Sequence, residues 1–521
     1  MFAMSKARKY LPALWFVLVA FAWLGPTLAG RVIFALDADL AIYYYAILSF
    51  YSDALHAGQS FLWIPSIFSG FPVYLSQSGG FLDPINILIF SLLDGMTAVH
   101  VRLTLDIILT LTTSYLAARS LGLSRTAALL VGPSYLISLN LRYLSNPLTA
   151  NTIFLLPLLI FTAHATIRGT LSPIRAGIIA GIGLGWALLA GYTQLIVYAL
   201  LLAGLFTIGH VLWQKSDWKA LTRRLAVFGV ITLLLGSTIG LPFIVPAQKY
   251  FPLSARAEKA PLALTTLKSI EPGDLMLAFV PDYLYFPYIT SGRKAMYVGT
   301  AWFFLALGAL IVSVQAIRRR ERTDAERGAL VAGATGLFAL VAAFKWSPIF
   351  WAMTYLPVIG LFRFPFRFMF LGTFLFALLG GYGLDMMREI VRVRAWKLFV
   401  GTVSVLTTVF VFCIFALHVG GDALIRLLAN GGHSILGATV YGHAGFTKDP
   451  SHYRLAIENG LQAYREFFSI GDIGVVVGIG ILILSCVVFI GILRKWFSEE
   501  TGRWVTIGLI SLTVLCVPLS Q

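Results

Sequence analysis

Apolar residues form long runs along the chain, and short polar segments separate the runs. Most runs are roughly 17–23 residues long, enough for a helix to cross a hydrocarbon layer of about 30 Å. In lipid the backbone polar groups of a segment must pair within that segment, so each run predicts a helix. The predicted spans are 10–30, 101–119, 126–140, 150–167, 176–191, 193–212, 224–246, 298–317, 328–344, 366–386, 398–419, 471–493 and 503–520. The pattern predicts an all-α, multi-pass membrane protein of about 13 transmembrane helices.

The basic residues lie mainly on one side of these spans. The chain is 58% apolar and 12% charged, whereas soluble domains carry about 25% charged residues. With the N-terminus inside, the predicted cytoplasmic segments hold 23 of the 39 Lys and Arg residues and 8 of the 23 acidic residues. Cytoplasmic loops of membrane proteins are enriched in Lys and Arg. The net charge of +16 therefore indicates topology and gives no indication of nucleic acid binding.

This topology puts three long segments outside the cell membrane, 31–100, 247–297 and 420–470. The first apolar run, 11–29, exceeds the roughly 7–15 apolar residues of a signal peptide and is predicted to be an uncleaved span. All cysteines fall inside predicted spans, so no disulfide framework or zinc site is expected. We predict a division into residues 1–246, with spans 1–7 and the first long segment, and residues 247–521 with the rest.

The first long segment is predicted to be helix, coil and helix. Residues 41–57 are rich in tyrosine, typical of a helix in the headgroup region, and end at the potential cap Gly58. The stretch 63–80 contains several Pro and Gly residues and predicts an ordered coil. A second amphipathic helix should begin at Asp83-Pro84, with the aspartate as N-cap and the proline at the first helical position.

Asp37 and Asp39 follow the first span at its outer end. A carboxylate there can accept a proton from an acceptor hydroxyl, or help to bind a divalent cation such as Mg²⁺ or Mn²⁺ that keeps several waters. In extended chain the two side chains would face the same way. The alternative is that both residues only mark the membrane interface, and the spacing leaves the two interpretations open.

Arg363 and Arg367 lie four residues apart around Pro365, at the outer end of a predicted span. A guanidinium group matches phosphate oxygens with two parallel hydrogen bonds and stays charged at the interface. The aromatic residues on either side suit an apolar chain, so a lipid that carries a phosphate is the predicted ligand. The alternative is a pair of interfacial anchors that extend to the headgroups.

Other polar residues are candidates for weaker roles. Gln194 lies in a short turn between two spans, and it either hydrogen-bonds a sugar or satisfies the loop backbone. Gln77 and His56, in the first long segment, are further candidates for sugar or acceptor binding. Arg102 and Asp106 are predicted to pair with each other, which lowers the cost of burying either charge. Asp83 is interpreted only as a helix cap.

Several of these motifs resemble the YfhO-like family of bacterial membrane proteins. The first outer loop of that family is similar to Gly58-Gln-Ser-Phe-Leu-Trp63-Ile-Pro-Ser-Ile-Phe-Ser-Gly70-Phe-Pro72 and to Gln77-Ser-Gly-Gly-Phe-Leu-Asp-Pro84-Ile-Asn-Ile-Leu88. The Gly191-Tyr-Thr-Gln194 turn and the Arg363-Phe-Pro-Phe-Arg367 segment leading into Gly380-Gly-Tyr-Gly-Leu384 resemble it as well. The resemblance covers most of residues 30–390, and its motifs are short and moderately specific.

The resemblance implies the GT-C glycosyltransferase fold and a sugar donor linked to polyprenyl phosphate. Such enzymes carry an acidic residue on the first outer loop, and by position this role falls on Asp39, with Asp37 as the alternate. The expected protein is an inverting glycosyltransferase of the bacterial cytoplasmic membrane with an extracytoplasmic active site. Its acceptor would be a cell-surface glycan, teichoic acid or lipid. The donor phosphate role of Arg363 and Arg367 is inferred from their chemistry alone.

Two other classes of function remain open. A flippase or transporter of a lipid-linked sugar should have charged or broken helices near the bilayer midplane and often two related halves. No such halves are apparent in the sequence. A non-catalytic scaffold of envelope assembly should be indifferent to the substitution Asp39→Asn.

Overall fold

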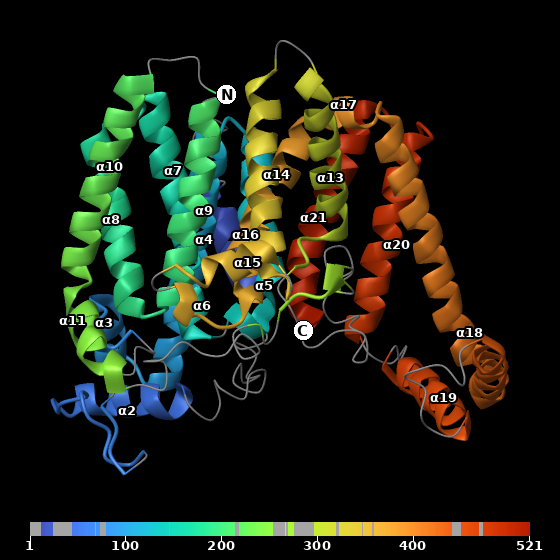
Figure 1. Cartoon of the computed structure of the whole chain (residues 1–521), viewed down its shortest axis with the longest axis horizontal. Helices are drawn as coiled ribbons and strands as arrows, with labels where there is room; N and C mark the ends of the chain where they lie inside the picture. Colours follow the sequence, from blue (N-terminus) through green and yellow to red (C-terminus); the bar gives the residue numbers. More distant parts are fainter. Residues whose placement is uncertain are drawn as a thin grey trace.

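The computed structural model describes residues 12–23, 44–67, 69–72, 80–144, 146–213, 218–253, 266, 269–272, 274–275, 296–318, 322–345, 347–356, 359–439, 450–467 and 473–520. In this part of the chain the helices stand side by side as a bundle (Figure 1). The β pairing in the same residues is limited to two isolated bridges, Ile64 with Phe71 and Ile270 with Phe344. The predicted all-α fold class is therefore confirmed for the described residues.

Each predicted span contains a helix in the structure. These helices are Pro12–Trp23, α4 (Gly95–Ser120), α5 (Arg125–Leu144), α7 (Leu155–Arg168), α8 (Pro173–Ala190), α9 (Thr193–Leu212), α10 (Trp218–Ile239), α13 (Thr300–Gln315), α14 (Asp324–Ala343), α16 (Met369–Asp385), α18 (Arg394–Thr439), α20 (Ile473–Leu493) and α21 (Glu499–Ser520). Among the described residues, 9 helices are long and apolar enough to cross a membrane. The multi-pass architecture is confirmed, while the count of 13 spans stays a prediction.

Several further helices are separate from these thirteen. They are α2 (Tyr45–His56), α3 (Pro84–Leu92), α6 (Pro147–Ala150), α11 (Leu241–Tyr250), α15 (Pro348–Met353), η9 (Pro365–Phe368), α17 (Met387–Ile390) and α19 (Pro450–Phe467). Helices α2, α3, α11 and α19 lie at one end, here called the loop end, and α17 lies at the other, here called the basic end (Figure 1). The side of the membrane that each end faces stays a prediction.

Ion pairs join neighbouring helices at the basic end. Arg168 of α7 pairs with Asp324 of α14 at 3.0 Å. Arg503 of α21 lies 3.1 Å from Asp385, the last residue of α16. All of these charged groups are partly exposed, so the pairs contribute little to stability, about 0–1 kcal/mol each.

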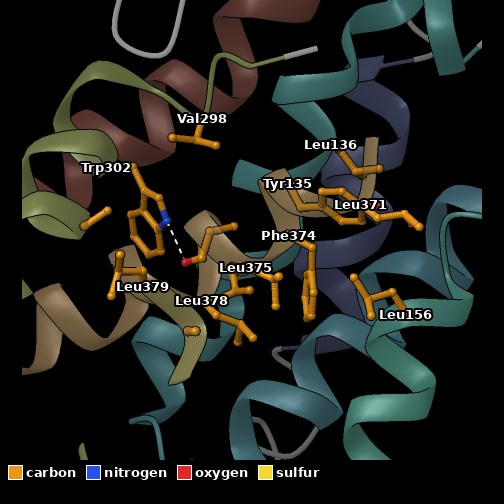
Figure 2. Packing of buried hydrophobic residues seen from close by; sticks show 14 of the residues in the cluster. Tyr135, Leu136, Leu156, Val298, Trp302, Leu371, Phe374, Leu375, Leu378 and Leu379 are labelled. Atoms are coloured by element: carbon orange, nitrogen blue, oxygen red, sulfur yellow. Dashed lines mark hydrogen bonds between the residues drawn. The ribbon is translucent and has the colours of Figure 1, made fainter. Parts of the chain in front are cut away.

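Helix α16 forms the centre of the hydrophobic core (Figure 2). The indole of Trp302, on α13, donates a hydrogen bond to the Ala377 carbonyl of α16 at 2.8 Å. On another side, the hydroxyl of Tyr135, on α5, donates to the Phe370 carbonyl at 2.8 Å. Gly380 is required here because a Cβ atom at this position would overlap the Trp302 indole. Helices from both predicted divisions of the chain therefore share one core.

Helices α8 and α10 approach closely through glycine residues. A Cβ atom at Gly181 of α8 would lie 2.9 Å from the Leu235 Cβ of α10, and one at Gly185 would lie 2.5 Å from the Ile239 Cβ. Small residues four positions apart allow helix backbones to pack tightly in a membrane. Helix α10 lies at the edge of the bundle (Figure 1). Only 17% of its most apolar 18-residue stretch is buried, so its other face is available to lipid.

Two predicted spans have different boundaries in the structure. The span predicted at 224–246 is divided into α10 and α11, because Pro242 in the first turn of α11 cannot continue the hydrogen bonding of a preceding helix. The span predicted at 398–419 extends into the third long segment, with a break at Gly421, where φ is 53° and ψ is −149°. Glycine adopts this conformation readily because it has no Cβ atom.

The third long segment contains two helices that the hydrophobic pattern did not reveal. The part of α18 beyond Gly421 packs against α19 at the loop end (Figure 1). An ion pair of 2.9 Å between Asp422 and Arg465 joins the two helices.

The first long segment agrees with its prediction over the described residues. Helix α2 ends at His56, and Gly58 follows with a φ of 63°. Helix α3 begins at Pro84, and the Asp83 side chain accepts a hydrogen bond from the Ile85 amide at 2.9 Å. The described part of 63–80 consists of turns, bends and irregular chain with the isolated bridge between Ile64 and Phe71, as expected of an ordered coil. Cys413, Cys486 and Cys516 are free thiols.

Candidate functional site

Arg367 is held in one orientation at the loop end of the bundle. Its Nη1 donates a hydrogen bond to Gln194 Oε1 at 2.7 Å, and Gln194 belongs to the first turn of α9. The guanidinium carbon lies 5.3 Å from the ring centroid of Tyr192 and 4.9 Å from that of Phe364. A guanidinium group in contact with aromatic faces gains electrostatic stabilisation. We call Tyr192, Gln194, Tyr198, Arg363, Phe364 and Arg367 the Arg367 cluster.

The Gln194 amide is fully engaged within this cluster. Its Nε2 donates to the Arg363 carbonyl at 2.7 Å and to the Tyr198 hydroxyl at 3.1 Å, and the side chain is buried. Tyr198 in turn stacks on Phe368, with ring centroids 3.6 Å apart and an interplanar angle of 13°. Gln194 therefore ties α9 to the chain segment that precedes α16.

Phe364 has a strained backbone, with φ at 63° and ψ at 76°. An aromatic residue rarely adopts a left-handed conformation, and the proline that follows restricts it further. Such conformations cost on the order of 1–3 kcal/mol and occur frequently at functional sites. Here the hydrogen bond from Gln194 to the preceding carbonyl, that of Arg363, helps to hold the strained segment.

The positive charge of this cluster is not neutralised within the described part of the chain. There, neither Arg363 nor Arg367 lies within ion-pair distance of a carboxylate. Both side chains are half-buried, and within the described residues Arg363 Nε is a buried donor without a hydrogen-bond partner. The guanidinium groups of Arg363 and Arg367, the second of which is oriented by Gln194, constitute a potential site for an anion such as phosphate.

A second group of charges is buried beside α3, and it includes the predicted pair Arg102 and Asp106. That pair is confirmed, since Arg102 Nε lies 3.1 Å from Asp106 Oδ2. Arg102 Nη1 also donates to Asp83 Oδ2 at 2.5 Å and to Asn86 Oδ1 at 2.7 Å. The indole of Trp186 donates to the same Asp83 oxygen at 2.7 Å. We call these five residues the Arg102 network.

The interpretation of Asp83 as only a helix cap is wrong. Its Oδ1 does cap α3, but its Oδ2 is the acceptor for Arg102 and Trp186. A carboxylate has enough lone pairs for both roles. The aspartate is fully buried, so the interior partners are needed to offset the loss of its hydration.

The two groups of residues are connected through the end of α8. Trp186 lies one turn before the end of this helix at Ala190, and the Gly191-Tyr192 turn leads into α9 and the Arg367 cluster. On the other side, a Cβ atom at Gly80 would lie 3.7 Å from the Ala190 Cα and 2.7 Å from Asn86 Nδ2. The chain that precedes α3 therefore packs directly against the end of α8.

Of the other predicted site residues, His56 alone lies within the described part of the chain. Asp37, Asp39 and Gln77 lie outside the described residues. His56 is described, and its side chain is exposed at the end of α2. Among the described residues, no group of three or more His, Cys, Asp and Glu side chains is arranged to hold a metal ion. The roles of these four residues stay predictions.

Some residues of the site were not singled out from the sequence. Tyr192 and Asn86 lie within motifs that resemble the YfhO-like family, and that signal was available without being assigned to contacts. Trp186 offered no signal in any sequence window, because its partner Asp83 is 103 residues away.

Fold and site together define a multi-pass, all-α membrane protein with a cationic cluster and a buried ion network at one end. No family model matches the chain, and no curated protein matches it. The chain is similar to several solved structures at low identity. The apo structure of ArnT from Cupriavidus metallidurans matches with a TM-score of 0.46 and 14% identity, over 95% of this chain and 75% of that one.

A second structure of ArnT from Cupriavidus metallidurans, bound to undecaprenyl phosphate, matches with a TM-score of 0.43 and 15% identity, over 91% of this chain and 71% of that one. The apo oligosaccharyltransferase from Archaeoglobus fulgidus matches with a TM-score of 0.43 and 12% identity, over 97% of this chain and 64% of that one. Similarity of this degree assigns no residue role and no activity to the chain.

Proposed function

We propose that the protein is an integral-membrane glycosyltransferase that moves a sugar from a polyprenyl-phosphate donor to a cell-surface acceptor on the extracytoplasmic face. The observation that supports this most is the oriented guanidinium group of Arg367 at the loop end of the bundle, which pairs with no carboxylate among the described residues. The resemblance of the sequence motifs to YfhO-like proteins supports the reaction class.

In this proposal Arg363 and Arg367 bind the donor phosphate. The Gln194 contact occupies one Nη atom of Arg367 and leaves other N–H groups of its fork for phosphate oxygens. Aromatic rings at Tyr192 and Phe364 surround the guanidinium group and supply apolar surface for the first isoprene units of the carrier. An arginine that is already oriented loses little side-chain entropy when the phosphate binds.

The chemical step is a displacement at the anomeric carbon. Asp39, or Asp37 as the alternate, accepts the proton of the acceptor hydroxyl while its oxygen forms the new bond to that carbon. The bond from the anomeric carbon to the phosphate oxygen breaks on the opposite face, and the electron pair leaves with the carrier phosphate. The configuration is inverted, and the phosphate is a sufficiently good leaving group without a general acid.

A divalent cation, Mg²⁺ or Mn²⁺, is compatible with this proposal but is required by none of its steps. Asp37 and Asp39 are too few ligands for a closed site, although they suffice for an ion that keeps several waters. Such an ion would supply positive charge to the departing phosphate.

Gln194 has a different proposed role from sugar binding. Its amide oxygen and nitrogen are both committed to protein partners, so we assign it the orientation of Arg367. Gln77 and His56 remain the proposed contacts of the sugar or the acceptor.

A transporter is less well supported by the described residues. The buried charges of Arg102 and Asp106 are bound to each other, and Arg102 is also bound to Asp83, so these charges are committed to contacts within the protein. The break in α18 at Gly421 belongs to the long segment at the loop end.

The test is a binding and transfer assay with the purified protein in lipid nanodiscs. We expect Asp39→Asn to bind polyprenyl phosphate as the wild type does and to lose sugar transfer, assayed with a panel of polyprenyl-phosphate sugars. The double variant Arg363→Gln with Arg367→Gln should lose affinity for the carrier. Arg426→Gln, an exposed arginine at the same end, is the matched control and should change neither quantity. Unchanged carrier affinity in the double variant, or full turnover in both Asp37→Asn and Asp39→Asn, would contradict the proposal.

A further inference from the structure

The Arg102 network connects separate parts of the chain through fully buried side chains. The exposed fractions of the Arg102, Asp83 and Asp106 side chains are 4%, 0% and 1%. Asp83 and Asn86 belong to the start of α3, Arg102 and Asp106 to α4, and Trp186 to α8. The amide nitrogen of Asn151, in the orientation that satisfies its surroundings, adds a hydrogen bond to Asp106 Oδ2. Burial of these side chains leaves little access for solvent to replace a displaced partner.

The contacts of Arg102 determine how the helices of the network meet. Arg102 and Asp106 are one turn apart on α4, and their contact sets the direction of the guanidinium group. Nη1 then faces both Asp83 and Asn86. The Asp83 oxygen that accepts from Arg102 also accepts from Trp186, so α3, α4 and α8 meet at one atom. A charged hydrogen-bond network in a low-dielectric interior is sensitive to small displacements.

On one side, the network fixes the first long segment. Ser52 of α2 donates to the Phe90 carbonyl at 3.2 Å and to the Leu93 carbonyl at 3.0 Å, which joins α2 to α3. The Tyr51 hydroxyl donates to the Phe81 carbonyl at 3.0 Å. Burial, and then the nearby Asp83 carboxylate, raise the pKa of Tyr51, so this hydroxyl stays protonated as a donor. Helix α2 therefore follows the position of α3, and the proposed base Asp39 precedes α2 in the sequence.

On the other side, the network fixes the end of α8. Trp186 is also in contact with the Arg102 guanidinium, whose central carbon lies 5.4 Å from the indole ring centroid. The turn that follows α8 carries Tyr192, and the next helix begins with Gln194 in its first turn; both residues orient Arg367. A shift of Trp186 relative to Asp83 would thus displace α2 and α3 relative to the Arg367 cluster.

We infer that the Arg102 network is a positioning device that holds α2 and α3 in a fixed position relative to the Arg367 cluster, and that sugar transfer by the proposed enzyme depends on this position. This inference rests on the proposed function for its catalytic part. Its residues touch neither substrate nor carrier, and they act through the elements that they join.

The test uses two variants of the full-length protein. Trp186→Phe removes one hydrogen bond to Asp83 and keeps an aromatic ring in place. Arg102→Lys keeps the charge but replaces the fork by a single ammonium group, which cannot reproduce the contacts to Asp83, Asn86 and Asp106 together. Trp351→Phe, the same substitution at an exposed indole of the loop end, is the control.

We expect kcat for sugar transfer to fall on the order of tenfold or more in both variants, because small misplacements of reacting groups have effects of this size. The Kd for polyprenyl phosphate should stay within about twofold of the wild type, since the oriented arginines that bind the phosphate are retained. Amide hydrogen exchange in α2 and α3 should become faster, while exchange in α19 stays unchanged. Trp351→Phe should resemble the wild type in all three measurements.

Failure of the inference can be distinguished from failure of the proposed function. Absence of transfer by the wild type on every donor would refute the function, and hydrogen exchange would still decide whether the network holds α2 and α3. Unchanged exchange in both variants overturns the inference. Faster exchange with an unchanged kcat overturns its catalytic part, as does an equal loss of kcat in Trp351→Phe. If Arg102→Lys does not fold, Trp186→Phe alone decides.

Discussion

Gln194 and Arg367 are 173 positions apart in the sequence, and their side chains share a hydrogen bond of 2.7 Å. The same glutamine also holds the Arg363 carbonyl, so one amide determines both the direction of the arginine and the path of the strained segment before it. This relationship turns a charged residue at the end of a helix into an oriented binding group. It also gives Gln194 a role that can be separated from sugar binding by mutation.

Removal of the Gln194 amide should weaken carrier binding. In Gln194→Ala the Arg367 fork loses its anchor, and hydrogen bonds to charged groups contribute about 1.5–3 kcal/mol. We expect the Kd for polyprenyl phosphate to rise about tenfold or more, since 1.4 kcal/mol corresponds to a factor of ten. Gln194→Glu should weaken binding further, because its carboxylate would pair with Arg367 and compete with the phosphate. Tight binding by Gln194→Glu would show that Arg367 does not contact the carrier.

Removal of the Arg102 charge should destabilise the protein strongly. In Arg102→Met the Asp83 and Asp106 carboxylates stay buried without their common partner, which costs about 3–5 kcal/mol in comparable cases. Thermal unfolding in detergent measures the loss. The triple variant that also contains Asp83→Asn and Asp106→Asn removes the unpaired charges, and it should regain much of the stability without regaining the positions of α3 and α8.

A matched control for this prediction lies at the basic end. Arg168→Met removes an ion pair of similar length whose side chains are 48% and 66% exposed. Surface pairs contribute about 0–1 kcal/mol, so this variant should unfold close to the wild type. An equal loss of thermal stability in Arg102→Met and Arg168→Met would contradict the conclusion that burial makes the Arg102 contacts more important for stability.

Glycine-to-alanine substitutions should distinguish the effect of the tight α8–α10 contact on stability from the effect of helix propensity. In Gly185→Ala the new Cβ atom would lie 2.5 Å from the Ile239 Cβ, so α8 and α10 must move apart. Overpacking of this kind costs about 1–3 kcal/mol. Gly204→Ala in α9 has no atom within 4 Å of the new Cβ and should be neutral or slightly stabilising, as alanine favours helices by up to about 1 kcal/mol. Equal shifts of the unfolding midpoint in Gly185→Ala and Gly204→Ala would contradict the close packing of α8 against α10.

Separate substitutions at Asp37 and Asp39 should identify the base. A general base contributes roughly a hundredfold to ten-thousandfold to a rate, so the residue that accepts the proton should lose that factor in kcat as its Asn variant. The other residue should show a smaller change. An equal loss in the two single variants that does not grow further in the double variant would indicate joint cation binding, and the activity would then depend on added Mg²⁺ or Mn²⁺.

The sequence predicted the spans well where an apolar run has clear ends. The span predicted at 193–212 coincides with α9, because Gly191 ends the preceding helix and the apolar run begins at once. Prediction failed where polar and apolar residues mix at short range. The helices beyond Gly421 carry no long apolar run, so their amphipathic pattern was not distinguished from a loop.

The site was only partly accessible to sequence reasoning. Arg102 and Asp106 are one helical turn apart, and their pairing follows from that spacing. The contacts of Asp83 with Arg102 and Trp186 were not predicted, because its position before Pro84 was already explained by its role as a helix cap. Gln194 and Arg367 were both singled out, but nothing in either local sequence indicates that they meet. Contacts of this kind depend on how helices far apart in the chain are arranged.

The meeting of α3, α4 and α8 at Asp83 also sets an order for biogenesis. Arg102 follows Asp83 by 19 residues, and this contact can form soon after the second span enters the membrane. Trp186 is synthesised 103 residues after Asp83, so during translation the start of α3 lacks this contact until α8 has been made. The nascent protein therefore passes through a stage in which α3 is joined to α4 and is not yet joined to α8.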